Sequence, residues 1–159
     1  MTPTTVIGVG NLLMGDEGLG VLAARALRER APAGVRVIEA GGVGIHLLGE
    51  IEDASRLLLL DCIDADRPPG EVLRLSGPEL PPPSATPLSP HELGLPDLLT
   101  LATLHGKPPE EVVVLGIQPA RIEPGAELSL EVASALPRLV REARDLLSRW
   151  DAGPSARTG

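Results

Sequence analysis

The stretch Val6–Gly20 constrains the fold of this chain more than any other. It begins as a short apolar run, passes through a loop punctuated by glycines, and ends at two adjacent carboxylates, Asp16 and Glu17. Apolar side chains then recur at helical spacing over residues 18–30, which end in basic residues. A strand, a glycine loop and a helix with acid at the junction are typical of open α/β sheets, whose sites lie at the carboxyl ends of the strands.

Length and composition limit the class of protein. A chain of 159 residues is expected to form one domain that buries roughly 70% of its unfolded surface. We assign residues 1–150 to this domain and residues 151–159 to a flexible tail. The core must be aliphatic, because the chain has one Trp and neither Phe nor Tyr. No apolar run reaches the ~20 residues of a bilayer span, and we expect no signal peptide.

The net charge and the cysteine content limit the classes of partner that the protein can bind and the compartment that suits it. The formal net charge of −8 argues against nucleic acid and anionic membranes as partners, because both require basic patches. The single cysteine, Cys62, excludes an internal disulfide and fits a reducing cytoplasm. A nucleophilic thiol is one interpretation of Cys62, but its position in an apolar strand favours a small buried apolar side chain. We therefore expect a cytoplasmic protein.

Short apolar segments alternate with helical patterns, which favours a three-layer α/β sandwich. Strands are predicted at about 4–9, 35–40, 57–60, 71–75 and 111–117, and helices at 18–30, 45–53, 91–104 and 130–150. The strand at 71–75 alternates in polarity, as an antiparallel edge strand does. Ser129 is expected to cap the last helix, and Pro137 to kink it or begin its second part. In the helix at 45–53, Ile45, Leu48 and Ile51 should face the core.

The order of the first three strands decides where a site can form. If the strands at 35–40 and 57–60 lie on opposite sides of the strand at 4–9, their connections cover opposite faces of the sheet. A crevice then opens between the carboxyl ends of the first and third strands. Glu17 follows the first strand, and Asp61 directly follows four leucines of the third. We therefore expect both carboxylates at the rim of this crevice.

Asp16 and Glu17 cannot both face one site, because neighbours on a helix point about 100° apart. Helix capping accounts for Asp16, which we expect to cap its own helix. Capping explains Glu17 less well, because the glycines around it imply close approaches of the backbone. For Glu17, a structural and a functional role both stay open. Asp64 and Asp66 lie further along the loop after Asp61, and we expect them to be solvated.

Among the three histidines, His91 is the best candidate for a site. His105 lies near a predicted helix C-terminus, where an imidazolium complements the helix dipole. His46 is expected on an exposed helix face. His91 follows the Pro- and Ser-rich segment 76–90, and a loop of this length is usually functional or mobile. Proline just before a helix is also common, so a structural role for His91 stays open.

Glu17, Asp61 and His91 together form a set of two carboxylates and one imidazole. Such a set suits a borderline divalent ion and leaves positions open for another ligand. The three residues come from separate segments, so no metal-spacing motif links them.

Other catalytic and nucleotide-binding motifs do not fit. Gly8-Val9-Gly10 after a strand is like the start of a dinucleotide fingerprint, but the third glycine would fall at Leu13. The acid at 16–17 would also repel a pyrophosphate. The sequence has no P-loop lysine pattern, no Gly-x-Ser-x-Gly elbow and no His-Glu-x-x-His helix. Nucleotide binding is therefore not expected.

Motifs spread in order over residues 5–148 resemble those of the hydrogenase maturation endopeptidases. They are Gly8-Val-Gly-Asn11 with Gly15-Asp-Glu-Gly-Leu-Gly20, Asp61-Cys-Ile after the leucine strand, Ser89-Pro-His-Glu-Leu-Gly-Leu95, and Gly116-Ile-Gln-Pro119 with Leu128-Ser129. The chain departs from the family pattern at Gly42, where a hydroxyl residue is common, and at Ala120, where an acid is common.

The resemblance implies a phosphorylase/hydrolase-like fold, with a twisted, mostly parallel five-stranded sheet between helices and one antiparallel strand. It implies an endopeptidase that removes the C-terminal extension of a nickel-iron hydrogenase large-subunit precursor after nickel insertion. The metal is nickel presented by the precursor, with no permanent cofactor, and the protease is expected to be a monomer. By motif position the catalytic and metal-contacting residues are Glu17, Asp61 and His91, and the substrate contacts are Gly10, Asn11, Glu39 and Gly41.

Two questions stay open at the level of the sequence. Either water polarised near the metal and activated by a carboxylate base, or direct attack by a carboxylate, could break the peptide bond. A non-hydrolytic nickel-sensing or chaperone module on the same fold is the alternative function, and a dinucleotide-binding protein is a third.

Overall fold

A computed structural model describes residues 3–82 and 93–152 of the chain. Within them five strands form one sheet in the order β2-β1-β3-β5-β4. Four strands run parallel, and β4 lies antiparallel to β5 at one edge. The predicted mostly parallel sheet with one antiparallel strand is confirmed. The strands are β1 (Thr4–Val9), β2 (Arg36–Ala40), β3 (Arg56–Cys62), β4 (Val72–Ser76) and β5 (Glu111–Ile117).

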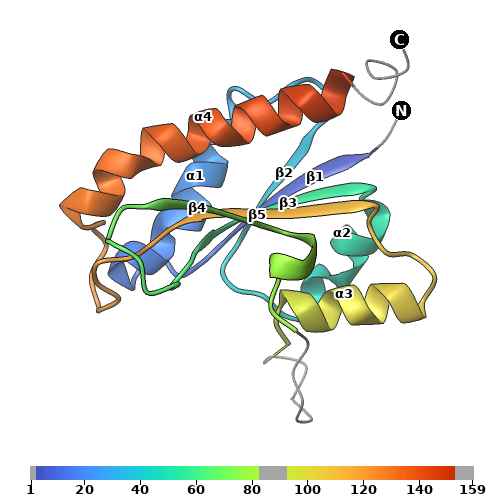
Figure 1. The fold of residues 1–159 in the computed structure, drawn as a ribbon, viewed down its shortest axis with the longest axis horizontal. Coiled ribbons are helices and arrows are strands. Elements are labelled where there is room, and N and C mark those ends of the chain that lie inside the picture. Colours follow the sequence, from blue (N-terminus) through green and yellow to red (C-terminus); the bar gives the residue numbers. More distant parts are fainter. Residues whose placement is uncertain (1–2, 83–92, 153–159) are drawn as a thin grey trace.

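Helices cover both faces of the sheet, which confirms the three-layer α/β/α sandwich (Figure 1). On one face lie α1 (Leu19–Arg28) and α4 (Leu130–Ala152), and on the other α2 (Leu48–Asp53) and α3 (Leu95–Leu104). No helix in the described part of the chain is both long enough and apolar enough to cross a bilayer. Short 3-10 turns precede α1 and α2 and follow β4: η1 (Gly15–Gly18), η2 (Ile45–Leu47) and η3 (Gly77–Glu79).

The sheet carries an aliphatic core on each face, because alternate side chains of a strand point to opposite sides. Leu58 and Leu60 of β3 pack with α1 and α4. Leu57 and Leu59 pack with α2 and α3. All four leucines are at most 3% exposed, as expected for a strand covered on both faces. Trp150, the one tryptophan, is buried near the end of α4.

The crevice lies where the strand order predicts it. β2 and β3 pair with opposite edges of β1, and α1 and α2 lie on opposite faces of the sheet. The carboxyl ends of β1 and β3 are therefore neighbours at the point where the connections diverge. The start of α1 packs directly on these ends, because a Cβ on Gly20 would lie 2.3 Å from the carbonyl oxygens of Leu60 and Val9. Glycine at this position brings η1, and with it Glu17, to the crevice.

The predicted inward position of Ile45 is wrong. Its side chain is 41% exposed, whereas Leu47 is 4% exposed and packs in the core. Residues 45–47 form a 3-10 turn, which has three residues per turn and changes which side chains face inward before α2 begins.

The ends of the last two helices also differ from the prediction. The described part of α3 begins at Leu95 rather than at residue 91, after an extended Gly94 whose N–H donates to Asp97 Oδ2 over 3.0 Å. α4 is one helix that continues through Pro137 and ends at Ala152, so the predicted tail is helical at residues 151 and 152. The remaining seven residues lie outside the described part.

Candidate functional site

Two of the three predicted site residues, Asp61 and Glu17, lie at the crevice. Asp61 is the next-to-last residue of β3, and Glu17 belongs to η1 just before α1. Both side chains are half-buried. Burial raises the pKa of Asp61 to about 7. The Cys62 N–H, which donates to Asp61 Oδ1 over 2.7 Å, acts to lower this pKa. The negative charge of Glu17 acts to raise it further. The two carboxylates are therefore close enough to repel each other.

Such a pair can bind a cation or hold a proton. A carboxyl group with a pKa near 7 can release or accept a proton at neutral pH, which suits a general base. A divalent cation bound by both carboxylates would relieve their repulsion and keep both ionised. The geometry therefore fits metal recognition, base-assisted hydrolysis, or both.

The third predicted ligand, His91, lies outside the described residues. Across residues 3–82 and 93–152, no group of three or more His, Cys, Asp and Glu side chains is arranged to hold a metal ion. Of the other histidines, His46 is exposed, as predicted. His105 follows the last residue of α3, and its Nδ1 lies 2.6 Å from Glu52 Oε2 on α2. The metal-contacting role of the trio stays a prediction.

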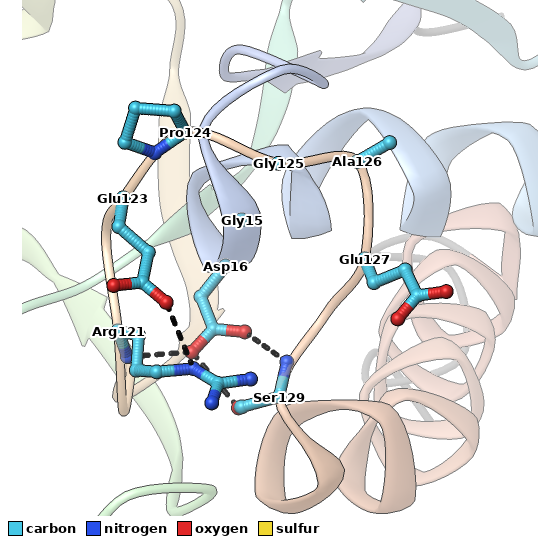
Figure 2. Close-up of a pocket in the computed structure, with 9 residues that line it drawn as sticks. All are labelled: Gly15, Asp16, Arg121, Glu123, Pro124, Gly125, Ala126, Glu127 and Ser129. Atoms are coloured by element: carbon cyan, nitrogen blue, oxygen red, sulfur yellow. Dashed lines mark hydrogen bonds and ion pairs between the residues drawn. The ribbon is translucent and has the colours of Figure 1, made fainter.

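The prediction that Asp16 caps its own helix is wrong. Its side chain is fully buried and accepts four hydrogen bonds from the loop after β5, of which Figure 2 shows those from Arg121 and Ser129. Oδ2 accepts from the N–H groups of Ala120 at 2.8 Å and Arg121 at 2.9 Å. The hydroxyl of Ser129 donates to Oδ2 over 2.9 Å and its N–H to Oδ1 over 2.7 Å. Burial acts to raise the pKa of Asp16, but these hydrogen bonds outweigh it and lower the pKa.

Backbone hydrogen bonds join the same two segments. The Gly125 N–H donates to the Leu13 carbonyl over 2.9 Å, and the Gly15 N–H donates to the Gly125 carbonyl over 2.8 Å. The Asp16 N–H donates to the Arg121 carbonyl over 3.2 Å. A polar cavity of about 340 Å³ lies between the segments. The loop after β5 is therefore attached to η1 along its length.

Ser129 caps α4, as predicted. Its Oγ accepts the Val132 N–H over 3.3 Å, and its carbonyl accepts the Ala133 N–H over 2.9 Å. Because the same hydroxyl donates to Asp16, the start of α4 is tied to the turn that carries Glu17.

Gln118, directly after β5, is a second buried polar side chain whose role was not predicted. Its Oε1 accepts from the N–H groups of Ala65 at 2.7 Å and Arg67 at 3.1 Å. Its Nε2 donates to Asp64 Oδ1 over 3.0 Å, which lowers the pKa of the exposed Asp64. Gln118 therefore organises the loop that follows Asp61. The sequence feature that could have indicated this role is a polar side chain directly after an apolar strand, at the edge of the sheet where sites form.

An apolar cavity of about 330 Å³ adjoins Asp61. Its walls come from β3, β4, β5, α3 and the loop after β2, and include Val43, Leu59 and Leu99. Cys62, predicted to be a small buried apolar side chain, also lines it and is only half-buried, with its side chain packed against the core. Burial, followed by the charge of Asp61, raises the pKa of the Cys62 thiol to about 12, so the thiolate is scarce at neutral pH.

Two predicted substrate contacts, Gly10 and Asn11, lie in the loop between β1 and η1. Gly10 has φ of +140°, and a Cβ there would lie 1.9 Å from the carbonyl oxygen of Glu17. Asn11 is exposed, and its Oδ1 accepts the Leu13 N–H over 2.9 Å. Both residues adjoin the turn that carries Glu17, and their contacts with substrate stay predictions.

The other two predicted substrate contacts, Glu39 and Gly41, lie at the end of β2. Glu39 pairs with Arg25 at 2.9 Å and with Arg28 at 2.6 Å. Hydrogen bonds from these two arginines lower the pKa of Glu39. Gly41 is exposed, and a Cβ there would meet no atom within 4 Å. The contacts of both residues with substrate stay predictions.

Comparisons with known proteins agree with one another. A family model described as hydrogenase maturation protease, HycI, matches residues 21–145. Hydrogenase expression/formation protein HoxM of Cupriavidus necator is 38% identical over 158 residues, which cover 96% of this chain and 77% of that protein. Hydrogenase 2 maturation protease of Escherichia coli is 33% identical over 134 residues, 82% of each chain. The solved structure of hydrogenase maturating endopeptidase HybD from E. coli has a TM-score of 0.80 at 30% identity, and covers 94% of this chain and 93% of that chain.

Proposed function

This chain belongs to the hydrogenase maturation protease family and is a peptidase, and we propose that it removes the C-terminal extension of a nickel-iron hydrogenase large-subunit precursor after nickel insertion. The observation that carries the proposal is the meeting of Glu17 and Asp61 at the crevice. They come from separate segments, and the charge of Glu17 contributes to the raised pKa of Asp61. This geometry supports recognition of a cation next to a group that can accept a proton.

Nickel is part of the substrate in this proposal, and the protease needs no resident cofactor. The precursor presents nickel to the carboxylates of Glu17 and Asp61 and to the imidazole of His91. Oxygen and nitrogen ligands of this kind suit a borderline divalent ion. Because nickel favours the ionised carboxylates, a precursor that carries nickel binds better than one without it. This difference in affinity would make cleavage depend on insertion of the metal.

The residues of the site allow two routes to cleavage of the peptide bond. Asp61 in its ionised form can accept a proton from a water that attacks the carbonyl carbon, and can pass this proton to the amine nitrogen as the C–N bond breaks. Alternatively, a carboxylate attacks the carbonyl carbon directly, the C–N bond breaks as the leaving amine takes a proton from water, and a second water hydrolyses the resulting anhydride. Both routes need Asp61 or Glu17 ionised at the moment of attack.

The apolar cavity beside Asp61 offers a binding place for the tail. Its aliphatic walls favour an aliphatic side chain of the precursor close to the bond that is cut. The folded precursor is thus held at two places, by its nickel at the two carboxylates and by its tail at the cavity. We further propose that the protease acts as a monomer in the cytoplasm.

Incubation with purified precursor, followed by intact-mass measurement, tests the function. We expect the mass of the nickel-loaded precursor to fall by that of its C-terminal extension, and the nickel-free precursor to stay whole. Glu17→Gln and His91→Ala should abolish cleavage while the circular dichroism spectrum stays native. Tight binding of the nickel-loaded precursor without a change in mass would instead indicate the non-hydrolytic nickel-sensing or chaperone alternative, and would contradict the proposal.

A further inference from the structure

The segment Gln118–Arg121 contacts both the loop that follows Asp61 and the turn that carries Glu17. It leaves the end of β5, which pairs with β3 up to Cys62 and Ile117. It then passes between the loop after Asp61 and the turn that carries Glu17. Each of these contacts is made by a buried polar side chain that accepts hydrogen bonds from backbone N–H groups.

On the Asp61 side, the contact is the side chain of Gln118, which is 6% exposed. It accepts the N–H groups of Ala65 and Arg67 and donates to Asp64, as described above. The backbone of Gln118 adds two hydrogen bonds, because its carbonyl accepts the Gly70 N–H over 2.9 Å and its N–H donates to the Glu71 carbonyl over 2.9 Å. The loop after Asp61 is therefore fixed to the start of the segment.

On the Glu17 side, the contact is the carboxylate of Asp16, the residue directly before Glu17. It accepts the N–H groups of Ala120 and Arg121, which form the other end of the segment. One residue, Pro119, separates Gln118 from Ala120, and its ring fixes its own φ. The two anchored ends are therefore joined by a short and stiff piece of backbone.

Burial of the side chains of Asp16 and Gln118 costs free energy, and the hydrogen bonds that they make in these positions offset this cost. Taking a carboxylate and an amide out of water is unfavourable unless hydrogen bonds replace those to water. Helix capping or packing alone would not require either side chain to bond a segment about 50 or 100 residues away in sequence. In both cases the bonds instead connect the same four residues to a segment that adjoins a site carboxylate.

We propose that Gln118–Arg121 is a brace that sets the distance between Glu17 and Asp61, and that Asp16 and Gln118 are positioning residues for recognition of the substrate metal. This inference rests on the proposed function of the two carboxylates. It adds that their separation is fixed before the precursor binds, by two residues that do not touch the substrate. Preorganisation of this kind reduces the cost of ordering the site when it binds its ligand.

The experiment compares Asp16→Asn, Gln118→Met and the double variant with the wild type. Asn at position 16 presents an NH2 group toward donors, and Met at 118 keeps the size of Gln without its hydrogen bonds. Glu127→Gln is the matched control, because it removes a charge from the same loop at an exposed side chain outside Gln118–Arg121.

The first readout is cleavage of nickel-loaded precursor by folded protein well below its melting temperature. We expect each single variant to lose about tenfold or more in kcat/KM, mostly through KM, as for other residues that orient metal ligands. The loss in the double variant should be little larger than the loss in the more impaired single variant, because one broken end already releases the brace. The control should keep the wild-type value. Unchanged kcat/KM in folded single variants, or losses that multiply in the double variant, would overturn the proposal.

The second readout needs no substrate and separates the brace from the proposed function. In amide NMR spectra, Gln118→Met should shift the resonance of Glu17, and Asp16→Asn should shift those of Asp61 and Cys62 across the brace. The control Glu127→Gln should shift neither set of resonances. If the wild type does not cleave any precursor, the proposed function fails while these shifts still test the brace. Shifts confined to the loop that was mutated would overturn the brace even if cleavage is observed. If Asp16→Asn does not fold, Gln118→Met carries both readouts.

Discussion

Replacement of Asp61 by Asn is expected to stabilise the fold while it removes activity. Burial raises the pKa of Asp61 from 3.8 to about 7. At about 1.4 kcal/mol for each pH unit between these values, the ionised carboxylate costs the folded state up to about 4 kcal/mol. Asn has no charge, and its Oδ1 can still accept the Cys62 N–H that now donates to Asp61. The variant should therefore avoid the cost without losing this hydrogen bond.

The gain in stability should depend on pH in a defined way. Between about pH 4 and about pH 7, folded protein keeps a proton on Asp61 that the unfolded chain has released, so the wild type loses stability as pH rises. Above about pH 7 both states are ionised and the loss stays constant. The free energy of unfolding of Asp61→Asn should match that of the wild type near about pH 4 and exceed it by about 2 kcal/mol near about pH 5.5. The excess should reach up to about 4 kcal/mol above about pH 7.

Urea unfolding followed by circular dichroism measures this difference across the pH range. Asp64→Asn is the matched control, because the hydrogen bond from Gln118 lowers the pKa of Asp64 and favours its ionised form. The control should therefore gain no stability at any pH. The reasoning is refuted if Asp61→Asn is no more stable than the wild type at about pH 8, or if its excess stability does not grow between about pH 4 and about pH 7.

Three further predictions concern activity and packing. The value of kcat/KM for precursor cleavage should fall by about tenfold per pH unit below about pH 7, because Asp61 must be ionised to contact the nickel of the precursor and the free protein holds a proton on it below that pH; a flat profile down to about pH 5 would argue against this. Val43→Phe should raise KM by about tenfold by filling the apolar cavity, while the melting temperature stays near that of the wild type; a normal KM would exclude the cavity as a binding place. Gly20→Ala should cost about 3 kcal/mol in urea unfolding, because its Cβ would lie 2.3 Å from the Leu60 carbonyl oxygen; an unchanged midpoint would show that α1 can move away without loss.

The sequence allows the sheet and the crevice to be predicted because both follow from local patterns. The alternation of strands and helices indicates a parallel sheet, and four leucines in a row at 57–60 indicate a strand that is buried on both faces. Right-handed connections between the strands then place Glu17 and Asp61 at the same edge of this sheet. The phase of the turn at Ile45 could not be predicted, because a 3-10 start and an α-helical start share the same residues.

The roles of Asp16 and Gln118 could not be predicted for a different reason. Their partners lie 104 to 113 residues away for Asp16 and 51 to 54 residues away for Gln118. Local sequence favours a cap for an acid at the start of a helix, and nothing local reveals that buried N–H groups of a distant loop need an acceptor. Positions of this kind are determined by tertiary contacts alone.

The central claim is that Glu17 and Asp61 contact nickel held by the precursor, and X-ray absorption at the nickel edge tests it most directly. The spectrum of nickel-loaded precursor should be recorded alone and after addition of Asp61→Asn, of Glu17→Gln and of the double variant, none of which is expected to cleave. The account predicts that Asp61→Asn, which keeps Glu17, and Glu17→Gln, which keeps Asp61, each add an oxygen or nitrogen ligand to the nickel, and that the double variant adds fewer. A nickel spectrum that stays the same when the protease binds the precursor would contradict it.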